Sequence, residues 1–289
     1  MKIFLRLFIA TIIISSCQPS SPALAPTIPV EAPARIDTLS IPSASMDKQI
    51  PAIIVLPAGY DSESSATYPV VYLLHGATGS YEGWSTGVPE LTAYASEQEL
   101  IIVCPDGGYT SWYWDSPIDP EIKYETHIIK EVIPYIDSVF RTRPQADQRA
   151  ITGLSMGGHG ALYLAARHPE VFQIAGSMSG GVDFRPFPEK WDIKERLGSL
   201  ENFPERWTAH TVINHAVAFA ENDQDLIIDC GIDDFFFEVN EALHRRLIEL
   251  DVEHDYTVRP GVHDWDYWRN AVEYQILFFD KAFNRGNRD

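Results

Sequence analysis

The stretch Gly153-Leu154-Ser155-Met156-Gly157-Gly158 is the most informative part of this 289-residue sequence. It follows the apolar run Ala150–Thr152 and precedes the helix-like run His159–Arg167. A Gly-x-Ser-x-Gly sequence in that context predicts a nucleophile elbow, a sharp turn that raises the serine at the carboxyl edge of a sheet and at the N-terminus of a helix. Glycines are needed beside the serine because a Cβ there would collide with the neighbouring strand and helix. Ser155 is therefore the candidate nucleophile, and a plain glycine-rich turn is the alternative.

Short apolar runs alternate with helix-like stretches on both sides of this motif. The predicted central strands are Val70–Leu74, Leu100–Cys104, Ala150–Thr152, Ile174–Met178 and Leu226–Cys230. Strands this uniformly apolar are buried on both faces, as a parallel sheet between two helix layers requires. We therefore predict an α/β fold class with a mostly parallel central sheet and helices on both faces.

The ends of the sheet and one long connection are also predicted. Arg35–Ser40 and Ala52–Leu56 indicate an antiparallel hairpin at one sheet edge, and Asp255–Val258 indicates a late strand. Between Phe184 and Asn222 prolines interrupt any long helix, which predicts a partly helical excursion over the strand ends.

A serine hydroxyl is a weak nucleophile until a base takes its proton and a carboxylate orients that base. His263 is the candidate base, because it lies in the glycine-containing loop Pro260–Trp265 directly after the last predicted strand. The carboxylate is expected after the strand that ends at Cys230, where Asp233 and Asp234 are both available. A glycine-led loop needs a few residues to turn back over the sheet end, which favours Asp234 and keeps Asp233 as the alternative.

Two backbone N–H groups are expected to face the oxygen of a tetrahedral intermediate. Met156, directly after the nucleophile, supplies one, and we assign the other to Ala77 in the tight turn Leu74–Gly79. No pair of Cys residues stands at zinc-ligand spacing, so we expect no metal and no cofactor.

The N-terminus is typical of a signal peptide. Lys2 and Arg6 precede the apolar run Leu7–Ile14, which is too short for a membrane-spanning helix of about 20 residues. The run ends in Ile14-Ser15-Ser16-Cys17, which resembles the bacterial lipobox, where cleavage leaves a lipidated cysteine at the new N-terminus. Cys17 is therefore the predicted lipidation site, with an ordinary signal peptide and an incidental cysteine as the alternative.

These signals predict the organisation of the chain. Residues 1–16 form the lipoprotein signal peptide, residues 17–34, which are rich in Pro, Ser and Ala, form a flexible tether, and residues 35–289 form the catalytic domain. A lipid at Cys17 would hold the protein at a membrane of the bacterial cell envelope, on the periplasmic side or at the cell surface.

The net charge argues against one class of partner, and the cysteine positions argue against a disulfide. With 22 basic and 41 acidic residues, a net charge of −19 repels polyanions, so we expect no nucleic-acid partner. Cys104 and Cys230 end strands on opposite sides of the sheet centre, too far apart for a disulfide, and we expect both thiols to be free and packed.

Several motifs together resemble the putative-esterase family of feruloyl and acetyl xylan esterases. The resemblance is carried by Tyr72–Gly76, Ser111–Tyr113, Gly153–Leu162, Cys230–Phe235 and Gly261–Trp268, and it extends over roughly Arg35 to Ala282. It implies the α/β-hydrolase fold. It also implies a triad and an oxyanion hole at Ser155, Asp234, His263, Ala77 and Met156.

The resemblance implies a serine carboxylic ester hydrolase that acts through a covalent acyl-enzyme. Anchoring outside the cytoplasm suits the removal of acetyl or feruloyl-type acyl groups from carbohydrate esters. The aromatic residues Trp112, Tyr113, Trp265 and Trp268 follow or flank the predicted site loops and are expected to contact sugar or aromatic acyl groups, with packing in the core as their alternative role.

Other activities are compatible with the same pattern. One is an esterase for siderophores or small acyl esters, and another is a catalytically silent, carbohydrate-binding lipoprotein on the same fold. The family also includes S-formylglutathione hydrolases, tributyrin-type esterases and mycolyltransferases. A cytosolic formylglutathione hydrolase does not suit the signal segment, and the sequence does not predict the oligomeric state.

Overall fold

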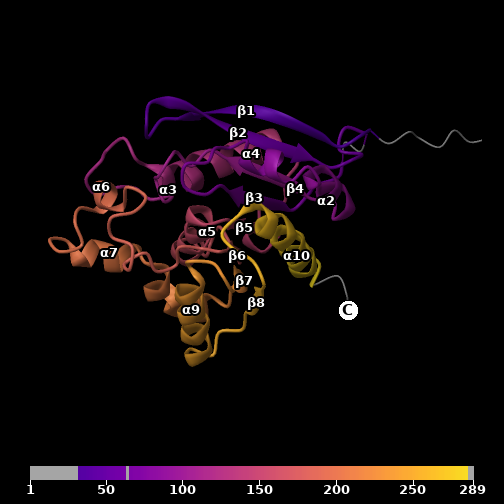
Figure 1. Cartoon of the computed structure of the whole chain (residues 1–289). Helices are drawn as coiled ribbons and strands as arrows, with labels where there is room; N and C mark the ends of the chain where they lie inside the picture. The colour runs from indigo at the N-terminus through magenta and orange to yellow at the C-terminus, as the bar shows by residue number, and fades with distance from the viewer. Residues whose placement is uncertain (1–31, 63–64, 286–289) are drawn as a thin grey trace, which may run out of the picture. The chain divides into compact units, whose positions relative to one another are not determined.

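The computed structural model describes residues 32–62 and 65–285. Its eight strands form one sheet in the order β1-β2-β4-β3-β5-β6-β7-β8 (Figure 1). The strands are β1 Arg35–Ser43, β2 Lys48–Leu56, β3 Val70–Leu74, β4 Ile101–Pro105, β5 Arg149–Gly153, β6 Ile174–Met178, β7 Asp225–Gly231 and β8 Asp255–Arg259. The predicted signal peptide, the tether as far as residue 31 and Cys17 lie outside the described residues.

The sheet is mostly parallel, as predicted. Pairing is antiparallel between β1 and β2 and between β2 and β4, whereas every later pair from β4 to β8 is parallel. The predicted hairpin is therefore confirmed, with β1 at the edge of the sheet. Carboxyl ends of parallel strands meet at one edge of a sheet, and in such folds that edge carries the site.

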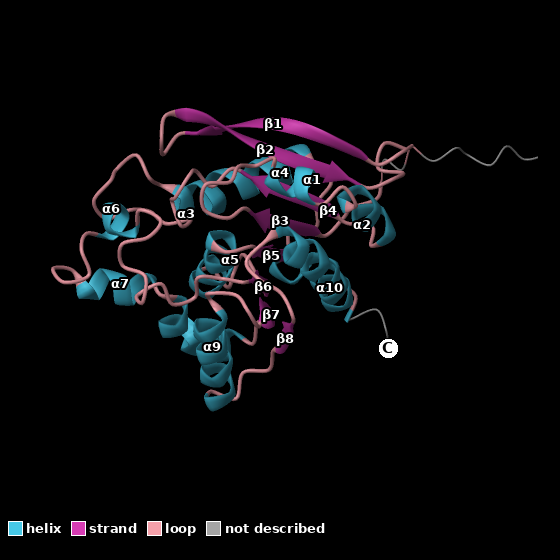
Figure 2. Ribbon diagram, viewed as in Figure 1, coloured by secondary structure: helices cyan, strands magenta, loops and turns pink. Residues whose placement is uncertain are grey.

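Helices cover both faces of the sheet (Figure 2). The helical elements are α1 Gly83–Gly87, α2 Leu91–Glu97, α3 Tyr124–Thr126, the π-helix η1 His127–Val132, α4 Ile133–Val139, the 3-10 helix η2 Ala146–Gln148, α5 Met156–Arg167, α6 Ile193–Leu197, α7 Pro204–His210, the 3-10 helix η3 Val212–His215, α8 Ala216–Asn222, α9 Phe237–Glu249 and α10 Trp265–Phe283. No helix in the described part of the chain is long and apolar enough to span a membrane.

The core has two layers, one on each face of the sheet, because successive side chains of a strand point to opposite faces. Tyr72 and Leu74 of β3 pack with residues of η1, α4, α5 and α9, whereas Val71 and Leu73 pack with residues of α1, α2 and α10. Successive side chains of a strand point to opposite faces, so a strand that is apolar at every position needs helices on both sides. The predicted fold class is confirmed.

The excursion predicted between Phe184 and Asn222 is present. It carries the short helices α6 and α7 (Figure 1) and, before β7, α8. It leaves the sheet after β6 and returns before β7. Cys104 and Cys230 are free and buried, as predicted.

A buried histidine predicts how the fold responds to acid. His159 on α5 accepts a hydrogen bond from Trp114 Nε1 (3.0 Å) and donates from Nδ1 to the Gly181 carbonyl (3.0 Å), so its ring is neutral. Burial lowers the pKa of His159 from 6.5 to about 3. Below pH 6.5 the unfolded chain therefore gains a proton that the folded chain does not bind until about pH 3.

Acidification from pH 6 to pH 4 should accordingly lower the free energy of unfolding by up to about 1.4 kcal/mol per pH unit through this ring alone. Urea unfolding of His159→Gln over this range should show a shallower fall than the wild type. Parallel curves for the two proteins would contradict this account.

Candidate active site

Ser155 occupies a strained turn between β5 and α5. Its φ is +56° and its ψ is −117°, a conformation that residues with a Cβ rarely adopt. The turn is held because the Ser155 N–H donates to the Met178 carbonyl (2.9 Å) and the Ser155 carbonyl accepts from the His159 N–H (3.0 Å). These bonds place the side chain at the carboxyl end of the sheet.

The glycines beside Ser155 are required by contact with β3. A Cβ on Gly153 would lie 2.5 Å from the Leu74 carbonyl oxygen, and one on Gly157 would lie 2.3 Å from the same atom. Both contacts are with backbone, which cannot rotate away as a side chain can. Larger residues at either position would separate β3 from α5 and displace Ser155.

The structure brings Ser155, His263 and Asp234 into one hydrogen-bonded line. His263 Nε2 lies 2.9 Å from Ser155 Oγ, and His263 Nδ1 lies 2.8 Å from Asp234 Oδ2. The Asp234 side chain is fully buried, and its Oδ1 accepts the Phe236 N–H at 2.8 Å. Asp234 therefore fixes the proton on Nδ1, which leaves Nε2 free to accept the serine proton.

Of the two aspartates considered above, only Asp234 reaches His263 in the structure. The Asp234 N–H donates to the Gly231 carbonyl (3.1 Å), which closes a turn that points the side chain inward. Asp233 is exposed, and its N–H donates to the Gly261 carbonyl (3.0 Å). The glycine-led loop thus turns back as the sequence argument required.

A buried ion pair that we did not predict supports the His263 loop. Asp229 on β7 pairs with Arg259 on β8 and accepts the hydroxyl of Tyr267 on α10. Burial raises the pKa of Asp229, although Tyr267 and Arg259 act in the opposite direction. Since residues 259 and 267 flank His263, the pair fixes both ends of the loop that carries the base.

The amides of Ala77 and Met156 face no acceptor. Neither N–H donates a hydrogen bond within residues 32–62 and 65–285, and Met156 begins α5. A Cβ built on Gly76 would lie 3.3 Å from Ser155 Cβ, so the loop that carries Ala77 runs beside the serine. Two N–H groups without an acceptor thus lie on the segments beside the nucleophile, which is a requirement of an oxyanion hole.

His75 holds the loop that carries Ala77. Its Nδ1 donates to the Gly76 carbonyl (2.8 Å), and its Nε2 accepts the Gly107 N–H (2.8 Å). Burial lowers the pKa of His75, which keeps the ring neutral so that Nε2 can accept. The sequence placed His75 in a turn but did not reveal this function.

A cavity of about 500 Å³ opens over Ser155. The residues that line it are His75, Gly76, Ala77, Thr78, Gly79, Gly83, Leu154, Ser155, Trp191, Phe235, His263, Trp265 and Trp268. Trp265 and Trp268 are thus placed as the sequence suggested, and no Lys or Arg is among these residues. The described residues include no group of three or more His, Cys, Asp or Glu side chains placed to hold a metal ion.

The prediction that Trp112 and Tyr113 contact substrate is wrong. Both residues have positive φ, 57° and 61°, which turns this segment inward, and they are only 1% and 0% exposed. Trp112 stacks on Trp114 at 5.5 Å, and the Tyr113 hydroxyl donates to the His75 carbonyl at 3.1 Å. They are core residues that support the site from beneath.

Trp191 and Phe235 line the cavity but were not predicted to do so. Phe235 directly follows the triad aspartate, whereas Trp191 lies in the excursion between Phe184 and Asn222. Their rings stack at 5.7 Å with an interplanar angle of 21°. The order of residues along the chain gave no signal for this pair, because about 40 residues separate its members.

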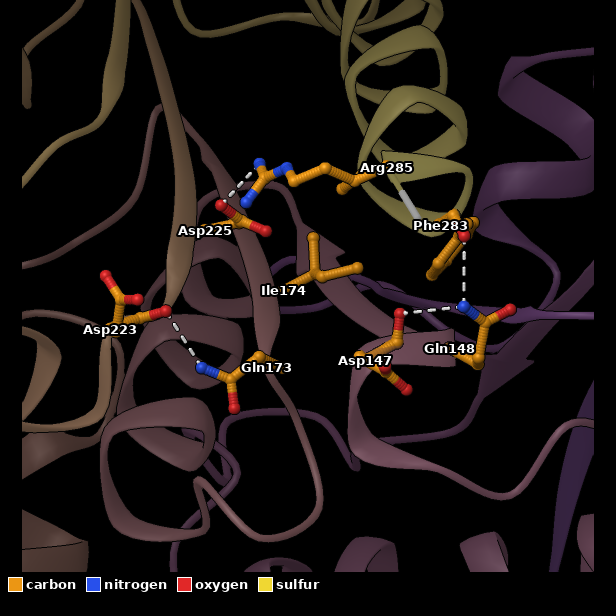
Figure 3. A pocket seen from close by; sticks show the side chains of 9 residues that line it. Asp147, Gln148, Gln173, Ile174, Asp223, Asp225, Phe283 and Arg285 are labelled. Atoms are coloured by element: carbon orange, nitrogen blue, oxygen red, sulfur yellow. Dashed lines mark hydrogen bonds and ion pairs between the residues drawn. The ribbon is translucent and has the colours of Figure 1, made fainter. Parts of the chain in front are cut away.

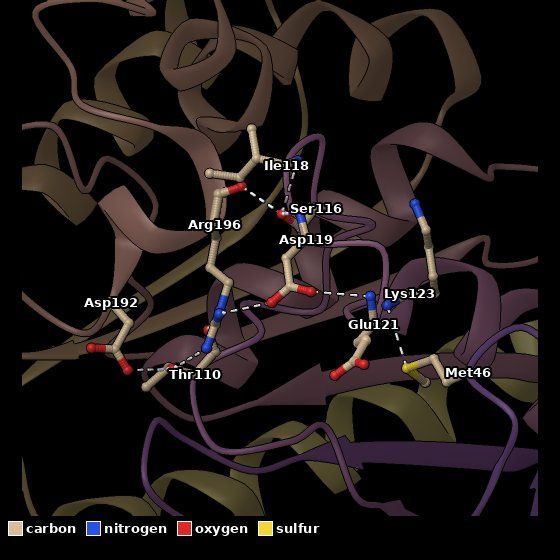
Figure 4. Close-up of polar contacts among 9 residues, drawn as sticks. All are labelled: Met46, Thr110, Ser116, Ile118, Asp119, Glu121, Lys123, Asp192 and Arg196. Atoms are coloured by element: carbon tan, nitrogen blue, oxygen red, sulfur yellow. Dashed lines mark hydrogen bonds and ion pairs between the residues drawn. The ribbon is translucent and has the colours of Figure 1, made fainter.

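A polar network holds the segment that carries Trp191 (Figure 4). Arg196 donates from Nε to the Thr110 carbonyl (3.1 Å), and Thr110 Oγ1 donates to Asp192 Oδ2 (2.7 Å). Ser116 Oγ donates to the Arg196 carbonyl (2.7 Å). Trp191 and Asp192 have φ of 51° and 53°, a left-handed turn that costs about 1–2 kcal/mol per residue and persists because this network holds it.

A second cavity, of about 430 Å³, lies at the opposite end of the strands (Figure 3). Several of its polar groups bond to one another: Arg285 pairs with Asp225 (2.7 Å), and Gln173 donates to the Asp223 carbonyl (2.9 Å). It contains no nucleophile with a neighbouring base, so the carboxyl edge of the sheet remains the candidate site.

Fold and site together define a protein of the α/β-hydrolase class with a hydrogen-bonded Ser, His and Asp at the carboxyl edge of its sheet. The chain belongs to the putative esterase family, whose model matches residues 43–278. This confirms the resemblance inferred from the sequence motifs.

Individual relatives agree with this assignment. The chain is 40% identical over 139 residues to an esterase of Mycobacterium tuberculosis, a match that covers 46% of this chain and 29% of the relative, so it spans less than a third of that protein. An acetyl esterase of Caldicellulosiruptor saccharolyticus is 26% identical over 237 residues, 77% of this chain and 86% of the relative.

Solved structures are similar over most of the chain. A ferulic acid esterase matches with a TM-score of 0.77 and 25% identity, covering 87% of this chain and 99% of the other. An S-formylglutathione hydrolase from Staphylococcus aureus matches with a TM-score of 0.75 and 21% identity, covering 86% and 99%. At 21% identity, the similarity to the S-formylglutathione hydrolase shows a shared fold.

Substitutions at two of the three hydrogen-bonded residues, Ser155 and Asp234, test the site. Ser155→Ala should lower kcat by up to about 10⁶-fold while thermal unfolding is unchanged, because the glycines rather than the hydroxyl hold the elbow. Asp234→Asn should lower kcat by roughly 10⁴-fold, since an amide favours the wrong imidazole tautomer. The measurement is hydrolysis of a nitrophenyl ester.

Asp233→Asn is the matched control for Asp234→Asn, because it makes the same change one residue away on an exposed side chain. It should stay within about twofold of the wild type. If the control lost more activity than Asp234→Asn, the acid would have to be reassigned by one position.

Proposed function

We propose that this protein is a serine carboxylic ester hydrolase that acts through a covalent acyl-enzyme and removes acetyl or feruloyl-type acyl groups from carbohydrate esters. The observation that carries the proposal is the line from Asp234 through His263 to Ser155, with distances of 2.8 and 2.9 Å, beneath an open aromatic cavity. A structural serine would need neither the strained elbow nor a buried carboxylate behind the histidine.

The first half of the reaction forms the acyl-enzyme. Ser155 Oγ attacks the ester carbonyl carbon as His263 Nε2 takes its proton, and the carbonyl oxygen becomes an oxyanion facing the N–H groups of Ala77 and Met156. Asp234 offsets the charge of the imidazolium. The intermediate then collapses, the C–O bond to the alcohol breaks, and His263 gives its proton to the departing oxygen.

The second half releases the acid. Water takes the place of the alcohol, His263 Nε2 accepts one of its protons, and the resulting hydroxide adds to the acyl carbon. The second tetrahedral intermediate collapses with cleavage of the bond to Ser155 Oγ, which recovers the proton from His263. The complete reaction consumes one ester and one water and releases an alcohol and an acid.

The cavity supports an uncharged, aromatic or small acyl group. Its aromatic residues, Trp191, Phe235, Trp265 and Trp268, provide ring faces, and no cation lines it to pair with the carboxylates of a glutathione thioester. The similarity to an acetyl esterase and to a ferulic acid esterase also favours this substrate class.

We further propose that Cys17 carries a lipid that keeps the enzyme at the cell envelope, on the periplasmic side or at the surface. The basis is the sequence Ile14-Ser15-Ser16-Cys17 behind a short apolar run. Several acyl chains, each stabilised by about 0.8 kcal/mol per buried CH₂, make such an attachment close to permanent.

A series of acyl groups tests the substrate class. The value of kcat/KM should be highest for acetyl or feruloyl esters and lowest for palmitoyl esters, because Leu154 is the one large aliphatic side chain among the residues that line the cavity. Formylglutathione serves as the control for thioesters. A maximum at palmitoyl, or a decisive preference for the thioester, would overturn the substrate class and leave the triad in place.

Membrane attachment has its own test. Cys17→Ala should convert a protein that requires detergent for extraction into a soluble or unprocessed one, whereas Cys104→Ala, at a buried thiol, should remain membrane-bound. The measurement is fractionation of lysed cells into membrane and soluble parts at high salt, with the protein detected by an antibody. A processed Cys17→Ala protein that still sediments with membranes would disprove the lipid anchor.

A further inference from the structure

The cavity over Ser155 has two different aromatic sides. On one side Trp265 lies against α1, where a Cβ on Gly83 would approach its ring to 3.6 Å and one on Gly87 to 2.3 Å. Trp84 and Trp268 meet the Trp265 ring edge to face at 5.4 and 5.5 Å. This side, which we call the acyl wall (Trp265 and Trp268), is packed against α1 and against Trp84.

The other side is open. Trp191 and Phe235, which we call the alcohol platform, stack on each other at 5.7 Å, and Phe235 is 49% exposed. The Phe235 ring centroid lies 4.2 Å from that of His263, closer than any ring of the acyl wall. About half of the Phe235 surface is therefore apolar surface open to solvent beside the catalytic histidine.

We propose that the alcohol platform binds a sugar ring of the leaving alcohol, while the acyl wall takes the acyl group. This inference rests on the proposed ester hydrolysis. The leaving oxygen must come within hydrogen-bond reach of His263 Nε2 to receive its proton, so the atoms attached to that oxygen extend past the His263 ring, where Phe235 lies.

The chemistry of the two sides agrees with this division. Stacked aromatic faces suit the apolar C–H faces of sugar rings, and an open edge admits a long oligosaccharide. The acyl wall lines the same cavity as the loop that carries Ala77, whose N–H would bind the carbonyl oxygen of the acyl group. A small or planar acyl group fits beside it.

Two buried residues position the platform without lining the cavity. Trp112 Nε1 donates to the Trp191 carbonyl (3.1 Å), and Thr110 Oγ1 donates to Asp192 Oδ2 (2.7 Å), which holds the left-handed turn at Trp191. Both come from the loop after β4 rather than from the excursion. They act on substrate only through Trp191 and are therefore positioning residues.

The test compares a methyl ester with the ester of an arabinoxylan trisaccharide. Both esters carry the same acyl group, acetyl or feruloyl, chosen as the one that the wild type hydrolyses. The ratio of kcat/KM for the sugar ester to that for the methyl ester should fall about tenfold in Trp191→Leu and Phe235→Leu, mainly through KM. Thr110→Val should lower the same ratio about threefold.

Two controls separate positioning from general damage. Thr208→Val makes the same change within the excursion, at a hydroxyl that donates to the Pro204 carbonyl, and should leave the ratio unaltered. Trp265→Leu should shift the order of acyl groups instead of the sugar-to-methyl ratio. A constant ratio in both platform variants, or a changed acyl order in them, would overturn the proposal.

A binding measurement keeps the two proposals distinguishable. If the wild type hydrolyses no ester, the proposed function fails. Calorimetric titration with the trisaccharide then tests the alcohol platform, and it compares Ser155→Ala with the double variant Ser155→Ala, Trp191→Leu. About tenfold weaker binding in the double variant supports the platform, and equal binding by both proteins disproves it.

Discussion

The close contact between the Leu74 carbonyl and the two glycines of the elbow is the constraint on which the site depends. The same oxygen accepts the Leu154 N–H (3.2 Å) and Trp84 Nε1 (3.0 Å), so one atom joins β3, the turn at Ser155 and α1. Because the loop with Ala77 begins directly after Leu74, this junction sets the distance between nucleophile and oxyanion donors. A single displaced backbone atom would therefore disturb both.

The parts of the fold that depend on local pattern were predictable from the sequence. Uniformly apolar strands such as Val70–Leu74 require cover on both faces, and the Gly-x-Ser-x-Gly turn requires its strand and helix, so sheet, helix layers and Ser155 followed from few residues. His263 followed from its place after the last strand. The choice between Asp233 and Asp234 depended on how a loop turns, which the sequence favoured but left open.

What the sequence could not give depends on contacts between distant segments. Trp112 and Tyr113 were expected either to contact substrate or to pack in the core, and the structure places both in the core. Trp191 and Phe235, about 40 residues apart, meet only in the folded chain. Asp229 likewise has the sequence context of an ordinary strand residue, and its partners Arg259 and Tyr267 lie about 30 and 40 residues further along the chain. In each case tertiary packing rather than local propensity decides the outcome.

The excursion between β6 and β7 has an evolutionary consequence. It departs from one strand and returns to the next, so its length can change without altering the register of the strands on which Ser155, Asp234 and His263 depend. Lineages that share the chemistry of this fold can diversify by rewriting this one segment, much as antibodies vary loops on a constant framework. In this chain the segment supplies Trp191 to the cavity, whereas Phe235, Trp265 and Trp268 lie within five residues of Asp234 or His263.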